Sequence, residues 1–305
     1  MTAATAAPAS SARHAWRRFA RHRLAVASFF VLVILCLLAF SAPLFELALG
    51  TDSERVNLFS RHAPPSAQAI LGTDELGRDV FLRLLEGGQV SLLVGLTAAI
   101  AAAVIGTFIG LVAGYFGGRF DAFLMRFTDG IIALPLLPLL IVLAAIDLDK
   151  LGIPAAIANS ENISLYRIIL IVALVGWTTV ARLVRGAALS IREREYVQAA
   201  RVQGAGSWRI MRVHILPNLI SPIIVATTLS VGNIILLESV LSFLGLGIQP
   251  PIPSWGNLLT NAQALISTAP LLAFYPGFLI LLTVLAFNFL GDGLQDALDP
   301  RAVRR

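Results

Sequence analysis

Six long apolar runs, separated by polar segments, dominate the pattern of this sequence. A helix needs about 20 apolar residues to cross the roughly 30 Å hydrocarbon layer of a membrane. The fourth run is the shortest, because its uncharged core covers only residues 168–181. The pattern predicts an all-α membrane protein with six transmembrane helices, at Leu24–Pro43, Val90–Gly114, Ala122–Ile146, Ile163–Ala181, Leu216–Leu237 and Pro270–Leu290.

Arginines concentrate on one side of the predicted membrane. Of the 23 basic residues, 17 lie in the two terminal tails, around the start of the third run, or in the segment before the fifth. Basic residues favour the cytoplasmic face, so both termini are expected to be cytoplasmic. A cleaved signal peptide in place of the first span is an alternative, because basic residues also precede the apolar stretch there. The expected division is a cytoplasmic tail (1–23), the first transmembrane helix (24–43), an external loop (44–89), a five-helix core (90–291) containing a cytoplasmic loop (186–215), and a second cytoplasmic tail (292–305).

Composition supports a membrane protein. Of 305 residues, 57% are hydrophobic and 13% are charged, whereas soluble domains carry about 25% charged residues. The net charge of +5 comes from arginines at the ends of apolar runs, so we expect lipid rather than nucleic acid as the partner of the basic residues. Cys36 is the only cysteine and the four histidines are scattered, which predicts neither a disulfide nor a metal site.

The chain lacks two common catalytic motifs. A phosphate-binding loop requires Gly-Lys-Ser/Thr, but the only lysine, Lys150, is followed by Leu151. The sequence also contains no G-x-S-x-G nucleophile elbow. We therefore expect a non-catalytic protein with no cofactor.

Small residues and prolines mark special positions in the apolar runs. Ala98, Ala102, Gly106, Gly110 and Gly114 recur every four residues and form one small-residue stripe on a helix. Such a stripe allows close helix packing in lipid, either within the chain or as a moving seam beside a pore or a partner membrane chain. Kinks are predicted at the prolines within later runs, which are Pro135, Pro138, Pro222 and Pro276.

A polar, arginine-rich segment at Glu195–Pro217 separates the fourth and fifth runs. Residues 188–203 are good helix formers and predict one helix, which Gly204 ends before a second short helix. Ala199 and Ala200 leave one side of the first helix nearly bare, which favours insertion into a groove on another protein. The alternative is an interfacial helix lying on anionic lipid with its arginines at the headgroups.

This segment resembles the E-A-A-x₃-G-x₉-I-x-L-P motif in permease subunits of ATP-binding-cassette (ABC) importers. Ala199, Ala200, Gly204, Leu216 and Pro217 fall on the pattern. Two positions depart from it, since Gln198 replaces Glu and His214 replaces Ile. The resemblance implies that an ATPase docks on a coupling helix, with contacts from Glu195, Tyr196, Gln198, Ala199, Ala200, Arg201 and Gly204.

Further blocks resemble the C-type subunit of dipeptide/oligopeptide and nickel importers. They are Leu71–Asp74, Gly77–Asp79, Gly114–Gly118, Leu124–Arg126, Ala181–Gly186, Leu241–Gly247, Pro250–Gly256 and Gly291–Arg301. The resemblance implies a prokaryotic inner-membrane complex of this chain with a B-type permease, two cytoplasmic ATPases and an external solute-binding protein. Short peptides are the expected cargo, with nickel or another small solute as the alternative.

Glu238 and the segment after it are candidates for the translocation pathway or its gate. A carboxylate near the hydrocarbon is costly and indicates function. Glu238 could instead form a local salt bridge or be solvated at the interface. Residues 242–256 contain too much Pro and Gly to span, so we expect them to fold over the outer mouth, and the candidate pathway or gate residues are Glu238, Ser242, Phe243 and Trp255.

Two other classes of protein remain as alternatives. An ion-coupled secondary transporter would need ionisable residues buried at mid-membrane, and the predicted spans have almost none away from their ends. A purely structural membrane scaffold would not need the helix break at Gly204.

Overall fold

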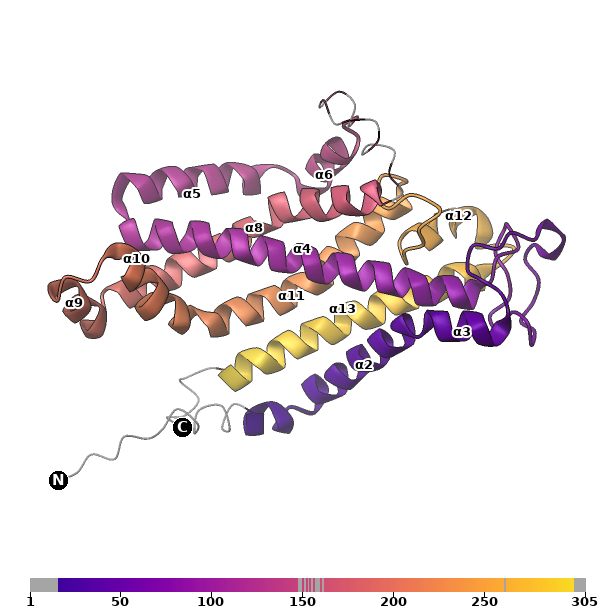
Figure 1. Ribbon diagram of the computed structural model, residues 1–305, viewed down its shortest axis with the longest axis horizontal. Helices are drawn as coiled ribbons and strands as arrows, with labels where there is room; N and C mark the ends of the chain where they lie inside the picture. Colours follow the sequence, from indigo (N-terminus) through magenta and orange to yellow (C-terminus); the bar gives the residue numbers. More distant parts are fainter. Residues whose placement is uncertain are drawn as a thin grey trace.

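A computed structural model of the chain describes residues 16–147, 162–260 and 262–298, together with single positions at 150, 152, 154, 156 and 160. Every regular element in this part of the chain is helical, which confirms the predicted all-α fold. Five helical stretches are long and apolar enough to cross a membrane by themselves, and they lie lengthwise in one bundle (Figure 1). They are α2 (Arg23–Phe40), α4 (Val80–Phe116), α8 (Ile163–Arg192), α11 (Leu216–Phe243) with the helical turns before it, and α13 (Pro270–Leu298).

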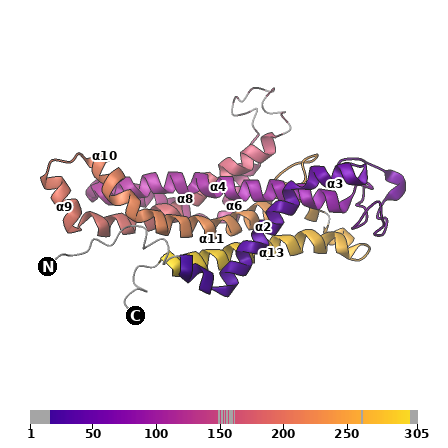
Figure 2. The same cartoon turned by 60° about the horizontal axis from the view of Figure 1, so that its bottom comes forward.

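Shorter elements lie at the two ends of the bundle and along its side. Figures 1 and 2 place α3 at one end and α9 at the other. The described start of α2 and the end of α13 lie in the half of the molecule that contains α9 (Figure 1). The short elements are α3 (Ala42–Leu49), η1 (Leu58–Ser60), α5 (Gly118–Ala133), α6 (Leu136–Ala144), α9 (Glu195–Val202), α10 (Ser207–Arg209), the π-helical turn η3 (Ile210–Ile215), η4 (Asn257–Leu259) and α12 (Ala262–Leu265).

The third predicted span is broken into two helices. α5 and α6 meet at an 87° bend, so the described chain has five long spans, or six if the bent pair crosses the membrane once. Leu134 is extended, with φ −74° and ψ 138°, because the ring of Pro135 disfavours helical geometry in the residue before it. In contrast, α11 and α13 continue through Pro222 and Pro276, where kinks were also predicted.

Several long helices extend beyond the predicted spans. α4 begins at Val80, ten residues before the predicted start, and α11 continues to Phe243 rather than Leu237. Asp79 caps α4 by accepting a hydrogen bond from the Leu82 N–H at 3.0 Å. Burial raises the pKa of the Asp79 carboxyl, while hydrogen bonds from the backbone of Leu82 and Phe81 act in the opposite direction.

The small-residue stripe on α4 packs against α8. A Cβ atom on Gly106 would lie 2.5 Å from the Trp177 carbonyl oxygen, and one on Gly110 would clash with the Ala181 carbonyl oxygen. The α4–α8 pair is the most extensive helix contact in the described chain. The stripe therefore packs within the chain, as the first of the two interpretations predicted, because α8 lies against the small residues of α4.

We expect Gly106→Leu to destabilise the folded chain by about 1–3 kcal/mol or more, because the larger side chain must displace the backbone of α8. The matched control is Gly186→Leu on α8, where an added Cβ meets no atom within 4 Å. Thermal unfolding of both variants in lipid nanodiscs would test this expectation. Equal unfolding temperatures for the two variants would contradict it.

Each long helix also leaves much of its apolar surface uncovered. The most apolar window of α4 is 44% buried within the chain, and that of α13 is only 22% buried. Large exposed side chains such as Phe30, Leu37, Phe108 and Phe274 make up this surface. A protein of this kind needs lipid or another membrane chain around it.

Candidate functional site

α9 is a short helix at one end of the bundle, connected to α8 by a sharp turn (Figure 1). The prediction of one continuous helix over 188–203 was wrong, because α8 ends at Arg192 and α9 begins at Glu195. Arg194 is extended, with φ −69° and ψ 144°. The Gln198 side chain donates a hydrogen bond to the Arg192 carbonyl oxygen at 3.1 Å, which satisfies one of the free carbonyls at the end of α8. A glutamate at position 198 could not donate this bond when ionised.

A buried cluster holds α9 against the long helices. Val197 has no exposed surface and packs with Val184 of α8, Met211 of η3 and Leu219 of α11. At the same place, Arg192 Nη1 donates to the carbonyl oxygen of Gly114 at 3.1 Å, at the end of α4. A displacement of α9 would therefore act on α4, α8 and α11 together.

The other predicted coupling residues lie on or beside the outer face of α9. Arg201 Cζ lies 5.7 Å from the centre of the Tyr115 ring, so its charge also ties α9 to α4. Gly204 has φ +86° and ends the helix as predicted, in a conformation that strains other residues. Glu195, Tyr196, Ala199, Arg201 and Gly204 are exposed, whereas Gln198 and Ala200 are half-buried.

The exposed surface around α9 includes two large apolar side chains that the sequence analysis missed. Val202 is 88% exposed and Trp208 is 59% exposed. The available signal was the presence of apolar residues in an arginine-rich segment with no other reason to carry them. We call these two side chains, together with Tyr196 and Ala199, the α9 surface, which is exposed and largely apolar at the end of the bundle.

The segment after α11, residues 244–260, lies at the opposite end of the bundle, near α3 and α12 (Figure 1). We call this segment the outer loop. Glu238 lies beneath it, with no exposed surface, and accepts hydrogen bonds from the hydroxyls of Ser242 at 2.7 Å and Ser91 at 3.3 Å. Both alternatives for Glu238 are wrong, because it is not solvated and forms no ion pair with any described residue.

The two serines link Glu238 to the backbone of the outer loop. The Ser242 hydroxyl oxygen accepts the Ile248 N–H at 3.0 Å, and that of Ser91 accepts the Trp255 N–H at 3.1 Å. Because each serine oxygen accepts a backbone N–H, its own proton is directed to the carboxylate. Trp255 is 2% exposed, and its indole N–H donates to the Leu84 carbonyl oxygen at 3.0 Å. Glu238 is thus the buried acceptor that fastens the outer loop to α4 and α11.

Phe243 differs from the other candidate gate residues. It stands at the end of α11 with 43% of its surface exposed, whereas Ser242 is 1% exposed. The structure therefore brings Glu238, Ser242 and Trp255 together in one network and leaves Phe243 beside it on the surface.

A cavity of about 430 Å³ lies near the middle of the bundle, where α5 and α6 break, and is bordered by α8 and α11. Its walls are mostly aliphatic, and its polar groups are neutral: Thr178, Thr179, Ser230 and Asn233. Asn233 is exposed and its amide forms no hydrogen bond with another described residue. An amide in an apolar helix favours water or another chain over lipid. The sequence analysis missed this cavity because it weighed charged residues and not neutral polar ones.

Metal binding has no support in the described part of the chain, where no three His, Cys, Asp or Glu side chains come together as a metal site.

Comparison with known proteins identifies the family of the chain. Residues 106–304 match the family described as binding-protein-dependent transport system inner membrane component. Residues 10–65 match the N-terminal transmembrane domain of oligopeptide transport permease C. These two matches cover the α9 surface, the outer loop and the first long helix.

Individual relatives match nearly the whole chain. The dipeptide transport system permease protein DppC of Bacillus subtilis is 42% identical over 97% of this chain and 87% of its own length. The oligopeptide transport system permease protein OppC of the same organism is 36% identical over 95% and 89%, respectively. The glutathione transport system permease protein GsiD of Pectobacterium atrosepticum is 40% identical over 95% and 91%. The family expected from the sequence motifs is confirmed: the chain belongs to the inner membrane components of binding-protein-dependent transport systems.

Proposed function

We propose that this chain is a permease subunit of an ABC importer that carries short peptides across a prokaryotic inner membrane. It would form half of the translocation pathway, with a second, B-type permease forming the other half. The observation that carries the proposal is the α9 surface, which lies on a short helix fastened to three long helices in the half of the molecule where the described chain begins and ends. The three relatives described above are all named transport system permease proteins, which supports the proposal.

In this proposal α5 and α6 together form one bent crossing, which gives six spans and places both termini in the cytoplasm. α9 would be the coupling helix, and the α9 surface would sit in a groove of a cytoplasmic ATPase. ATP-driven closure of two such ATPases would move α9, and the cluster around Val197 would pass that motion to α4, α8 and α11. The mid-bundle cavity lies against α8 and α11, so its walls would shift with them.

The second permease would cover the exposed face beside this cavity. The Asn233 amide and the Thr179 hydroxyl stand there on exposed positions of otherwise apolar helices. Facing a shared aqueous pathway would hydrate these groups, which lipid could not do.

Peptide cargo fits the lining of the cavity better than nickel does. Its polar groups are hydroxyls and one amide, which can hydrogen-bond to neutral peptide groups. Nickel sites favour imidazole and other strongly coordinating donors, and none of the cavity-lining residues is His, Cys, Asp or Glu. An external solute-binding protein would deliver the peptide at the end that carries the outer loop.

Affinity purification of the tagged chain from its native membrane, followed by mass spectrometry, tests the proposal. We expect two ATPases with phosphate-binding loops and a second permease to purify with it. Loss of dipeptide uptake when the chain is deleted should accompany this result. A chain that purifies alone, or as a homo-oligomer, under conditions that preserve other transporter complexes would contradict the proposal.

A further inference from the structure

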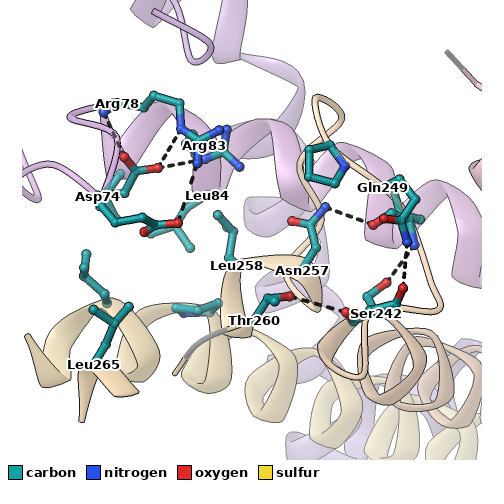
Figure 3. A pocket seen from close by; sticks show the side chains of 17 residues that line it. Asp74, Arg78, Arg83, Leu84, Ser242, Gln249, Asn257, Leu258, Thr260 and Leu265 are labelled. Carbon is teal, nitrogen blue, oxygen red and sulfur yellow. Dashed lines mark hydrogen bonds and ion pairs between the residues drawn. The ribbon is translucent and has the colours of Figure 1, made fainter. Parts of the chain in front are cut away.

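A second cavity, of about 280 Å³, lies at the outer-loop end of the bundle. One wall is the segment from Asp74 to Leu84, which leads into α4, and the other is the outer loop with the start of α13 (Figure 3). Asn257, Leu258 and Thr260 face Arg83 across the cavity (Figure 3). We call the connection between α3 and α4, residues 50–79, the external segment, and the cavity sits between the end of this segment and the loop that Glu238 fastens.

Arg83 is the unusual member of the cavity wall. Its side chain is only 5% exposed, and its Nε and Nη1 atoms have no hydrogen-bond partner among the described residues. The nearest carboxylate oxygen, Asp74 Oδ2, is 3.6 Å from Arg83 Nε, which is too long for a hydrogen bond. A buried guanidinium whose ion pair spans 3.6 Å and whose Nε and Nη1 donate no hydrogen bond to a described residue is costly, so a structure that keeps one favours an anion at that place.

The neighbouring acidic groups are already engaged. Asp74 Oδ2 accepts a hydrogen bond from Arg78 Nε at 2.7 Å, while Oδ1 accepts the backbone N–H groups of Leu76 and Arg78. The Glu75 carboxylate lies 3.9 Å from Arg78 Nη2. Arg78 and Arg83 together match the two acidic charges of the cavity wall, but the carboxylates accept their hydrogen bonds from Arg78 and the backbone, so Arg83 keeps donors that a ligand could satisfy.

The size of the cavity and its other lining residues limit which ligands it can hold. A volume near 280 Å³ is at the lower end for small-molecule sites and suits one end of a short chain better than a large solute. Apolar surface from Leu258, Leu265 and Leu272 lies alongside the guanidinium. A carboxylate with an adjoining apolar side chain matches this combination, since guanidinium groups pair well with carboxylates.

We propose that this cavity binds the free C-terminal carboxylate of a short peptide through Arg83. It would be a peptide-binding site at the outer mouth of the translocation pathway. The inference rests on the proposed function for its ligand. The bound peptide would lie between the external segment and the outer loop, so its binding would be sensitive to the position of that loop.

Isothermal titration of the full chain in lipid nanodiscs, with the subunits that purify with it and without ATP or binding protein, tests the site. The probes are alanyl-phenylalanine and its C-terminal amide. We expect the amide to bind about tenfold or more weakly than the acid, because it cannot offer a carboxylate to Arg83. In Arg83→Gln the acid should bind no better than the amide. In Arg83→Lys part of the difference in affinity between acid and amide should return.

Two further variants separate binding from folding. Leu265→Trp keeps Arg83 but fills the cavity, and it should also abolish acid-specific binding. Arg55→Gln changes an exposed arginine of the same external segment and should leave acid binding unchanged. Equal binding of acid and amide, no detectable binding of the acid, or unchanged acid binding in Arg83→Gln would each overturn the proposal.

Other sources of anion would give different results. If inorganic phosphate displaces the acid as well as an equal concentration of acetate does, the site is a general anion site and the proposed ligand class is wrong. If Arg83 instead receives an acidic side chain of the binding protein, the free acid gives no Arg83-dependent signal. The titration requires no ATPase activity, so a negative result would not contradict the importer proposal. The purification experiment tests that proposal separately.

Discussion

Ala199→Trp is expected to abolish ATP-driven uptake while the chain remains folded in the membrane. Ala199 is exposed on the α9 surface, and the large side chain would prevent α9 from entering a groove fitted to a small residue. Loss of a well-packed interface contact weakens association by about 2 kcal/mol or more, which corresponds to about thirtyfold in affinity. We expect the ATPases to be absent or strongly reduced when the variant is purified in its native lipid.

The control is Ala67→Trp, which places the same side chain on an exposed position of the external segment. It should leave uptake and ATPase association unchanged. Ala199→Ser should retain most of the ATP-driven uptake, because serine adds only one small atom. If Ala199→Trp still purifies with its ATPases and still transports, the α9 surface is not the docking site. The lipid-bound interpretation of this segment would then be favoured, and binding of α9 variants to anionic vesicles would test it.

The sequence was sufficient for the long helices and for the family. Apolar runs of about 20 residues have few other structures available to them. Gly204 marked where the helix before it ends, although that helix begins at Glu195 and not at residue 188. Helix ends were less predictable. Arg83, Glu86 and Gln89 look like loop residues, but in the structure they occupy the first turns of α4, where Gln89 donates a hydrogen bond to the Ala39 carbonyl oxygen at 2.7 Å.

What the sequence could not supply were contacts between residues far apart in the chain. Ser91 reaches Glu238 across 147 positions, and nothing near either residue indicates that pairing. The 87° bend at Leu134 was foreseeable as a kink from Pro135, but its size depends on how α5 and α6 pack. Arg185 and Asp121 form a two-point ion pair, at 2.5 and 2.6 Å, that fixes α5 against α8 from 64 positions away.

Glu238→Ala is expected to release the outer loop from the bundle. Without the carboxylate, the hydroxyl protons of Ser91 and Ser242 lose their buried acceptor, at a cost of about 1–3 kcal/mol. The backbone amides of Ile248 and Trp255, which those serines hold, should then exchange hydrogen about tenfold to a hundredfold faster. Hydrogen-exchange mass spectrometry of the chain in nanodiscs measures this directly, and Glu54→Ala, on an exposed external residue, is the control.

Glu238→Gln distinguishes two roles for this residue: holding the outer loop in place, and binding the solute. The amide keeps one acceptor oxygen but directs its N–H groups at one of the two serines, whose own proton then lacks a partner, so an anchoring role predicts faster exchange of the loop amides with a parallel loss of uptake. A residue whose role is to bind the solute predicts lost uptake with the loop amides still protected. Since Glu238 has no exposed surface in this conformation, we expect the first result. Unchanged exchange together with unchanged uptake would show that the buried carboxylate serves neither role.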